Sequence, residues 1–283
     1  MEGLEIDDLT VDLGKFRLDG LTCRVRKGCI TGLIGRNGAG KSTLIRTIMR
    51  QQNVASGSIL YNGKRFADAE AEILSSVACV FDAPHFNTYA KAKKIIKYYA
   101  AAYKSFDMQL CDSLMEKFRL PKDGRIVKYS FGMQRKFCLV LALAQRPKIL
   151  ILDEPTSGVD PYDRGEVVSL IQEYMLDEGN TVLFSTHVTE DLDKIADYVI
   201  MLDDGKIVLD NDKEFLTENY RLVTCAELTP QMKLNALGVR KNAFGYSFLT
   251  TDKELSGEGV QLKIPTLEEI FVHLLNGRHG DVL

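Results

Sequence analysis

The sequence has 283 residues, of which 45% are hydrophobic, so it accommodates one large domain with a core and a small addition. Its net charge of −3 argues against a broad electrostatic surface for nucleic acid. The six cysteines include no CxxC pair, which favours reduced cysteines over a disulfide framework or zinc site. We see neither a signal peptide nor a run as long as a membrane span, so any membrane role is expected to come from a partner.

Predicted strands and helices alternate along most of the chain. Apolar runs and alternating patterns predict strands, and apolar residues at helical spacing predict helices. The strands are expected at 4–9, 21–25, 29–35, 148–155 and 180–187, with a hairpin over 198–210 turning at Asp204-Gly205, and helices at 42–50 and 167–174. This alternation predicts an α/β architecture with a mostly parallel sheet.

Two segments depart from the alternation. Residues 88–145 read as helical throughout, and we expect them to form a helical subdomain inserted into a main domain over residues 1–214. Residues 215–283 are predicted to form a small α+β appendage. Within it, Thr266 and Glu269 have the spacing of a capping box at the start of a final helix.

The strongest motif lies between the predicted strand at 29–35 and the following helix. It matches GxxxxGK[ST], a phosphate-binding loop, and is made by Gly35, Arg36, Asn37, Gly38, Ala39, Gly40, Lys41 and Ser42, with Thr43 next. Its glycines allow backbone N–H groups to surround phosphate oxygens at the positive end of a helix. Lys41 is expected to reach the β- and γ-phosphates of ATP, and Ser42 to ligate Mg²⁺. The alternative is a chance glycine-rich turn.

A second motif is the apolar strand that ends in Asp153 and Glu154. Carboxylates at the carboxyl end of a buried strand lie over the ligand crevice of an α/β sheet. We predict that Asp153 holds Mg²⁺, through water, and that Glu154 is the general base for the attacking water. Without the phosphate-binding loop, the same pair would read equally well as an acidic, solvated turn.

His187 directly follows the third predicted core strand. A lone histidine at such a place is more often structural or merely exposed. Its position beyond Asp153 and Glu154 nevertheless predicts a hydrogen bond to the γ-phosphate that holds the geometry of the water.

In order and spacing, four segments resemble the motif set of the ABC ATPases: residues 35–42, 129–134, 152–161 and 185–187. The resemblance covers about residues 4–210. It implies a P-loop NTPase fold of the ABC ATPase type, with a mixed sheet, an inserted helical subdomain over 88–145 and the C-terminal α+β appendage. It also implies that ATP and Mg²⁺ are bound and that ATP is hydrolysed.

The resemblance assigns Tyr129-Ser130-Phe131-Gly132-Met133-Gln134 to the family's signature motif, usually LSGGQ. Phe131 and Met133 depart from that pattern, whereas Ser130 and Gly132 are kept. In the family this motif closes over the nucleotide of the opposite subunit, so Ser130 and Gly132 are expected to meet the partner's γ-phosphate in a head-to-tail dimer. Asp160 matches the D-loop aspartate at that dimer seam.

Two other family positions are changed. The glutamine of the Q-loop aligns with Asp82, which can still approach Mg²⁺ or water but is shorter and charged. The aromatic residue that stacks on adenine aligns near Leu13, so adenine is expected to rest on Leu13 or on nearby Phe16.

The segments FDAPHF, YSFGMQ and PTLEEIFVHLL resemble ATPase subunits of the bacitracin-resistance, lantibiotic-immunity and related peptide-exporting systems of bacteria. This implies a separate polytopic membrane permease, a homodimer or a heterodimer with a related subunit, and a place at the cytoplasmic face of the cell membrane, without nucleic acid. The alternatives are a soluble ABC ATPase acting on nucleic acid or ribosomes, another P-loop enzyme such as a small-molecule kinase, and a subunit that binds ATP but hydrolyses it poorly.

The lysines at 91, 93, 94 and 97 allow two interpretations. They form a solvated helix face, which we favour, or part of the groove that receives a cytoplasmic helix of the permease. Tyr89, Ile95 and Tyr98 would supply apolar contacts in the second case, and the helix is expected to align Ile95, Tyr98, Tyr99 and Ala102 on one face.

Overall fold

A computed structural model describes residues 3–257 and 259–279. Its central element is a six-stranded sheet in the order β10-β9-β3-β8-β7-β6, in which only the β9–β10 hairpin is antiparallel. The strands are β3 (Ile30–Ile34), β6 (Val77–Val80), β7 (Ile149–Asp153), β8 (Thr181–Thr186), β9 (Tyr198–Asp203) and β10 (Lys206–Asp212). The mostly parallel sheet and the hairpin at Asp204-Gly205 are as predicted.

Both faces of the central strands are buried, because β3, β7 and β8 have no exposed residue. Side chains alternate between the two faces of a strand. In β7, Ile149 and Ile151 therefore join one apolar cluster, and Leu150 and Leu152 join the other. Such continuous apolar strands require layers on both sides of the sheet.

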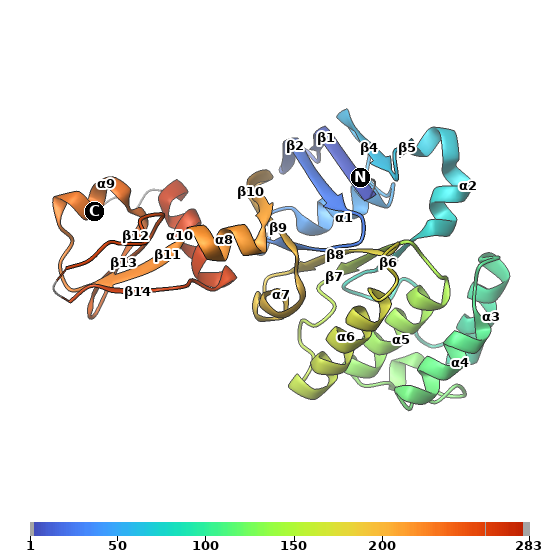
Figure 1. Cartoon of the computed structure of the whole chain (residues 1–283). Coiled ribbons are helices and arrows are strands. Elements are labelled where there is room, and N and C mark those ends of the chain that lie inside the picture. The colour runs from blue at the N-terminus through green and yellow to red at the C-terminus, as the bar shows by residue number, and fades with distance from the viewer. Residues whose placement is uncertain (1–2, 258, 280–283) are drawn as a thin grey trace.

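One layer is an antiparallel sheet in the order β2-β1-β4-β5, seen at the top of Figure 1. Helix α1 (Lys41–Ile48) lies between this sheet and the central one, and its Leu44 and Ile45 share a cluster with both. The strands are β1 (Gly3–Asp12), β2 (Arg17–Arg26), β4 (Ser56–Tyr61) and β5 (Lys64–Arg65), and helix α2 (Phe66–Ser76) leads from them to β6.

The helices of the other layer include the predicted insertion between β6 and β7 (Figure 1). They are α3 (Ala92–Ala102), α4 (Met108–Lys117), η1 (Ile126–Lys128) and α5 (Phe131–Ala144), followed after β7 by α6 (Pro161–Tyr174) and after β8 by α7 (Glu190–Ile195). Among the described residues, none of the helices combines the length and apolar character needed to cross a bilayer.

The expected face of α3 is partly wrong. Ile95 is buried, but Tyr98 is 72% exposed and Ala102 is exposed as well. The buried side of α3 is instead formed by Ala92, Ile95 and Ile96, which belong to the large apolar cluster that also contains residues of α4 and α5. Lys91 and Lys93 lie at the exposed helix start, 3.9 and 2.5 Å from Asp123.

The C-terminal segment forms a four-stranded antiparallel sheet, β12-β13-β11-β14, with helices at its ends. The elements are α8 (Lys213–Asn219), β11 (Arg221–Cys225), α9 (Pro230–Asn235), β12 (Leu237–Asn242), β13 (Gly245–Thr250), β14 (Gln261–Lys263) and α10 (Leu267–His279). The capping box predicted for α10 is confirmed: the Glu269 N–H donates to Thr266 Oγ1 at 3.2 Å and the Thr266 N–H to Glu269 Oε2 at 2.9 Å.

Helix α10 also anchors this segment to the main body. Leu267 and Ile270 are fully buried in the same apolar cluster as Leu192 and Ile195 of α7. The Leu267 N–H donates to Asp193 Oδ1 of α7 at 3.1 Å. The division at residue 214 stays a prediction from the sequence, and the buried cluster runs across it.

Replacing Ile270 with alanine should lower the free energy of unfolding by about 2–5 kcal/mol, because it removes a fully buried side chain from this shared cluster. Urea unfolding followed by circular dichroism measures the change. Ile264→Ala is the matched control: Ile264 is 63% exposed, and its loss should change stability by less than about 0.5 kcal/mol. Equal effects of the two substitutions would contradict the anchoring role of α10.

Candidate active site at the phosphate-binding loop

A cavity of about 770 Å³ opens at the carboxyl ends of the parallel strands. Most of the site residues predicted from the sequence line this cavity, although they come from distant segments of the chain. Its lining consists of Leu13, Phe16, Arg36, Asn37, Gly38, Gly40, Lys41, Ser42, Thr43, Asp82, Phe131, Arg135, Glu154, Ser157, Gly158 and His187. Gly35 and Ala39 are buried parts of the same loop.

The loop between β3 and α1 has the conformation that its glycines allow. Gly38 and Gly40 have φ angles of 85° and 112°, in the left-handed region that side chains disfavour. A Cβ atom on Gly40 would lie 2.6 Å from Leu18 Cδ2 and 2.8 Å from Phe16 Cζ. Phe16 therefore packs directly against the loop and forms one wall of the cavity, with Leu13 beside it, 44% exposed.

Lys41 brings a positive charge to the base of the cavity. Its side chain is 6% exposed, and Nζ donates a 2.8 Å hydrogen bond to the carbonyl of Gly35. Nζ also lies 3.4 Å from Glu154 Oε1. A buried ammonium group with backbone and carboxylate partners in a loop of this kind is suited to an anionic ligand that replaces the carboxylate.

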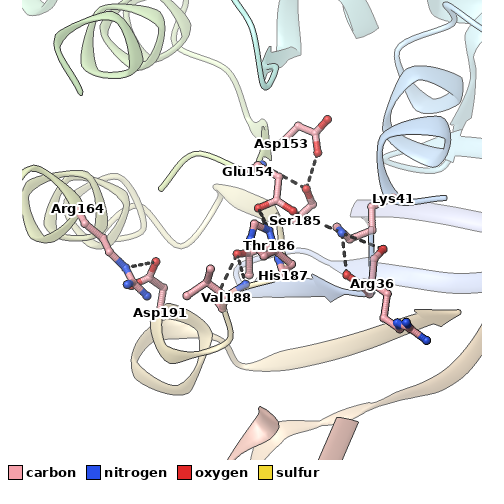
Figure 2. A network of polar contacts seen from close by, with 11 residues as sticks. Arg36, Lys41, Asp153, Glu154, Arg164, Ser185, Thr186, His187, Val188 and Asp191 are labelled. Carbon is pink, nitrogen blue, oxygen red and sulfur yellow. Dashed lines mark hydrogen bonds and ion pairs between the residues drawn. The ribbon is translucent and has the colours of Figure 1, made fainter. Parts of the chain in front are cut away.

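Glu154 stands directly after β7 with a φ of 50°, which is unusual for a residue with a side chain. The backbone is held there by a hydrogen bond from the Glu154 N–H to the Ser185 carbonyl at 3.1 Å. In this conformation the carboxylate lies between Lys41 and His187, whose Nδ1 is 2.8 Å from Oε2 (Figure 2). Backbone strain of this kind is typical of residues held for function.

Asp153 is 1% exposed and accepts a 2.6 Å hydrogen bond from Ser185 Oγ, as Figure 2 shows. The register of β7 and β8 places the two residues opposite each other. Ser185 was not predicted as a site residue, although its position two residues before His187 was a usable signal. The available donors, the Asp153 carboxylate and the Ser42 hydroxyl, are hard oxygen ligands, which suit Mg²⁺ that keeps waters and binds phosphate. Among the described residues there is no cluster of three or more His, Cys, Asp or Glu side chains for a metal ion.

The cavity lining does not include four further predicted residues: Ser130, Gly132, Asp160 and the buried Asp153. Ser130 caps α5 by accepting a hydrogen bond from the Met133 N–H at 3.2 Å. A Cβ on Gly132 would lie 2.1 Å from Asp163 Oδ2, so a larger residue there would have to displace the Asp163 side chain. Asp160 caps α6, and hydrogen bonds from the N–H groups of Asp163 and Tyr162 lower the pKa of its carboxyl group.

Four lining residues were not predicted as site residues, although three of them lie in the motif segments 129–134 and 152–161: Phe131 and Arg135 of α5, and Ser157 and Gly158 of the loop after β7. Phe131 and Arg135 are four residues apart on a helix, a spacing that puts side chains on one face. Asp82 follows β6 by two residues, is exposed and lines the cavity, and its charge favours the cationic form of Arg135.

The segment after His187 is tied to its neighbours by a buried ion pair. Arg164 of α6 donates from Nε to both carboxylate oxygens of Asp191 in α7, at 2.7 and 2.8 Å, and Asp191 is 1% exposed (Figure 2). Helix α6 is the helix that Asp160 caps. The strand end carrying His187 and the helix following Asp160 are therefore held together.

In comparisons with known proteins, the family model, the relatives and the solved structure that match this chain are all described as ABC transporter or transport ATP-binding proteins. A family model described as ABC transporter matches residues 18–157. The uncharacterized ABC transporter ATP-binding protein YdbJ of Bacillus subtilis (strain 168) is 32% identical over 207 residues, covering 72% of this chain and 67% of that protein. The bacitracin transport ATP-binding protein BcrA of Bacillus licheniformis is 29% identical over 233 residues, covering 81% and 76%. A solved structure of an ATP binding subunit of an ABC transporter aligns with a TM-score of 0.69 at 26% identity, covering 75% of this chain and 91% of that one.

Gly40→Ala should abolish binding of a fluorescent ATP analogue and lower stability by about 1–3 kcal/mol, because it forces a Cβ into Leu18 and Phe16 at positive φ. Gly165→Ala is the control, since nothing lies within 4 Å of a Cβ there and helical alanine should stabilise by about 0.5–1 kcal/mol. Fluorescence titration and thermal unfolding measure both effects. Wild-type affinity in Gly40→Ala would contradict the loop geometry.

Proposed function

The chain belongs to the ABC transporter family as an ATP-binding subunit, and from this premise we propose that it drives a separate membrane permease exporting peptides, antibiotics or related amphipathic molecules. Its reaction is the family's ATP hydrolysis. The observation that carries the proposed catalytic roles is the Glu154 carboxylate, with Lys41 Nζ at 3.4 Å on one oxygen and His187 Nδ1 at 2.8 Å on the other.

The arrangement explains how ATP would prepare its own hydrolysis. In the structure Lys41 is shared between backbone carbonyls and Glu154. Bound phosphates compete for Lys41, since a multiply charged anion is the stronger partner. Glu154 then loses its cationic neighbour on Oε1, and that oxygen becomes available to take the proton of the attacking water.

His187 would change partners in the same event. Because Glu154 Oε2 can only accept, the hydrogen of the 2.8 Å contact resides on His187 Nδ1. In the neutral ring Nε2 then accepts and cannot donate. A hydrogen bond from His187 Nε2 to the γ-phosphate therefore requires release from Glu154 or protonation of the ring.

Mg²⁺ would be held by Ser42 and, through water, by Asp153, with Asp82 as a further oxygen ligand at the cavity wall. When bound, the ion neutralises charge on the phosphates. Ser185 keeps the Asp153 carboxylate in one orientation by its 2.6 Å hydrogen bond. The loop of residues 35–43 binds the phosphates, and Leu13 and Phe16 form the wall on which adenine would rest.

The position of Ser130, Gly132 and Asp160 outside this cavity supports a head-to-tail dimer. Ser130 begins α5, and a helix start offers N–H groups and a positive dipole to an anion. In the proposed dimer these groups meet the γ-phosphate held by the partner, and Asp160 lies at the seam. The partner is a second copy or a related subunit.

The substrate class rests on the subgroup resemblance and on the bacitracin transport relative. Both also support a place at the cytoplasmic face of a bacterial membrane, bound to a polytopic permease. A soluble ABC ATPase acting on nucleic acid or ribosomes gains no support, because the relatives reported above are transporter proteins and the chain's net charge is −3.

Glu154→Gln should slow ATP hydrolysis by about 10²–10⁴-fold and leave ATP binding intact, because the amide keeps the shape of the carboxylate but cannot take the proton. Phosphate release and titration with a fluorescent ATP analogue measure the two effects. Glu178→Gln, an exposed change outside the cavity, should leave turnover unchanged. Undiminished turnover in Glu154→Gln would exclude it as the base.

Transport coupling is tested by purifying the chain from its native membranes in mild detergent, followed by mass spectrometry. We expect a polytopic membrane protein in stoichiometric amount. Recovery of the chain alone, or with ribosomes or nucleic acid, would overturn the permease assignment while leaving the ATPase chemistry in place.

A further inference from the structure

Arg135 is a buried cation at the wall of the nucleotide cavity. Only 7% of its surface is exposed, and it lines the same cavity as Lys41 and Glu154. Nη1 donates a 2.8 Å hydrogen bond to the carbonyl of Phe81, the last residue before Asp82. The residue thus joins the interior of α5 to the end of β6.

The Arg135 guanidinium has a hydrogen-bond donor that is not used in the structure. Among the described residues, Arg135 Nε is buried and has no hydrogen-bond partner. Burial lowers the pKa of Arg135, whereas the carboxylates of Asp82, Asp153 and Glu154 act in the opposite direction. Arginine stays protonated in proteins, so the group is a cation with an unsatisfied N–H beside a site for a triphosphate. An unsatisfied buried donor costs stability unless a ligand or rearrangement completes it.

Phe131 connects this cation to the start of α5. The Arg135 guanidinium carbon lies 4.8 Å from the centre of the Phe131 ring, within cation–π range. The ring is 50% exposed, reaches the cavity and lies beside Gly158. Because Phe131 stands between Ser130 and Gly132, the position of its ring is coupled to the segment that would face the partner's nucleotide.

We propose that Arg135 is a positioning residue that detects the γ-phosphate of ATP bound in its own subunit and sets the position of Phe131, and with it the Ser130–Gly132 segment. The inference rests on the proposed function. A phosphate oxygen is a stronger acceptor for a guanidinium than the Phe81 carbonyl, because the hydrogen bond is assisted by charge on both partners. Rebonding of Arg135 toward that oxygen alters the stacking on Phe131, so ATP in one site prepares the surface that completes the other.

A purely structural role would be simpler: Arg135 would pin α5 to β6 in every state. The two roles differ in one observable. A structural residue leaves the surroundings of Phe131 the same with ADP and with ATP, whereas a γ-phosphate detector makes them different.

The chain contains no tryptophan, so Phe131→Trp places a single fluorescent reporter at this position. We expect the emission of the introduced indole to differ between ADP–Mg²⁺ and the non-hydrolysable β,γ-imido analogue of ATP with Mg²⁺. Adding Arg135→Gln should remove that difference while both nucleotides still bind, as measured with a fluorescent nucleotide analogue. In the chain with Phe131 intact, Arg135→Gln should lower kcat by about three- to thirty-fold with little change in KM.

Arg125→Gln on the reporter background is the matched control, because Arg125 is exposed and lies outside the cavity; it should preserve the difference. Arg135→Lys provides the test if the glutamine variant does not fold. Arg135→Lys should reduce the difference in emission between the two nucleotides. The lysine ammonium keeps the charge, but it lacks the planar guanidinium that can hydrogen-bond and stack on the ring at the same time.

Equal emission with the two nucleotides, or a full difference that survives loss of the Arg135 guanidinium, would overturn the inference. Either result leaves the proposed function standing as long as Glu154→Gln still slows ATP hydrolysis strongly. If Glu154→Gln instead hydrolysed ATP at the wild-type rate, the result would count against the proposed function itself.

Discussion

Asp153 and Ser185 face each other across the parallel pairing of β7 and β8, and the geometry of the site depends on this register. Both strands are buried on both faces, so a slip by one residue would exchange the two apolar clusters that they separate. The same register lets the Ser185 hydroxyl orient Asp153 and lets the Ser185 carbonyl hold Glu154 in its left-handed conformation. His187, two residues further along, then meets the Glu154 carboxylate. The β7–β8 register that packs the apolar clusters is therefore the same register that sets the positions of Asp153, Glu154 and His187.

What could be predicted from the sequence is what local chemistry determines. The buried strands before Gly35 and up to Asp153 are short apolar runs, and the loop at 35–42 is defined by glycines whose backbone angles other residues disfavour. The Asp204-Gly205 turn and the Thr266–Glu269 capping box depend on residues within a few positions of each other, and both are confirmed. The alternation of strands and helices predicts a parallel sheet, and this is sufficient to bring Lys41, Glu154 and His187 to the same edge of it.

What could not be predicted depends on contacts between distant segments. Helical spacing indicated that Ile95 and Tyr98 share a face, but which side of α3 is buried is decided by the neighbouring helices. Ser185, Phe131 and Arg135 are ordinary residues by type, and only the folded chain shows that one orients a carboxylate and that the others line the cavity. The unusual φ of Glu154 is likewise imposed by β8 and is invisible in the residue itself.

Helix α7 has only six residues, yet it connects three parts of the molecule. Asp191 binds Arg164 of the helix capped by Asp160, Asp193 accepts from the first residue of α10, and His187 precedes the helix by three positions. Where binding at one site is coupled to binding at another through such contacts, the coupling free energy is the same in both directions. If a molecule that binds the C-terminal sheet changes the affinity for nucleotide by some factor, nucleotide changes the affinity for that molecule by the same factor. The C-terminal segment is therefore placed to act as a second input to the ATPase cycle, with no need to touch the nucleotide.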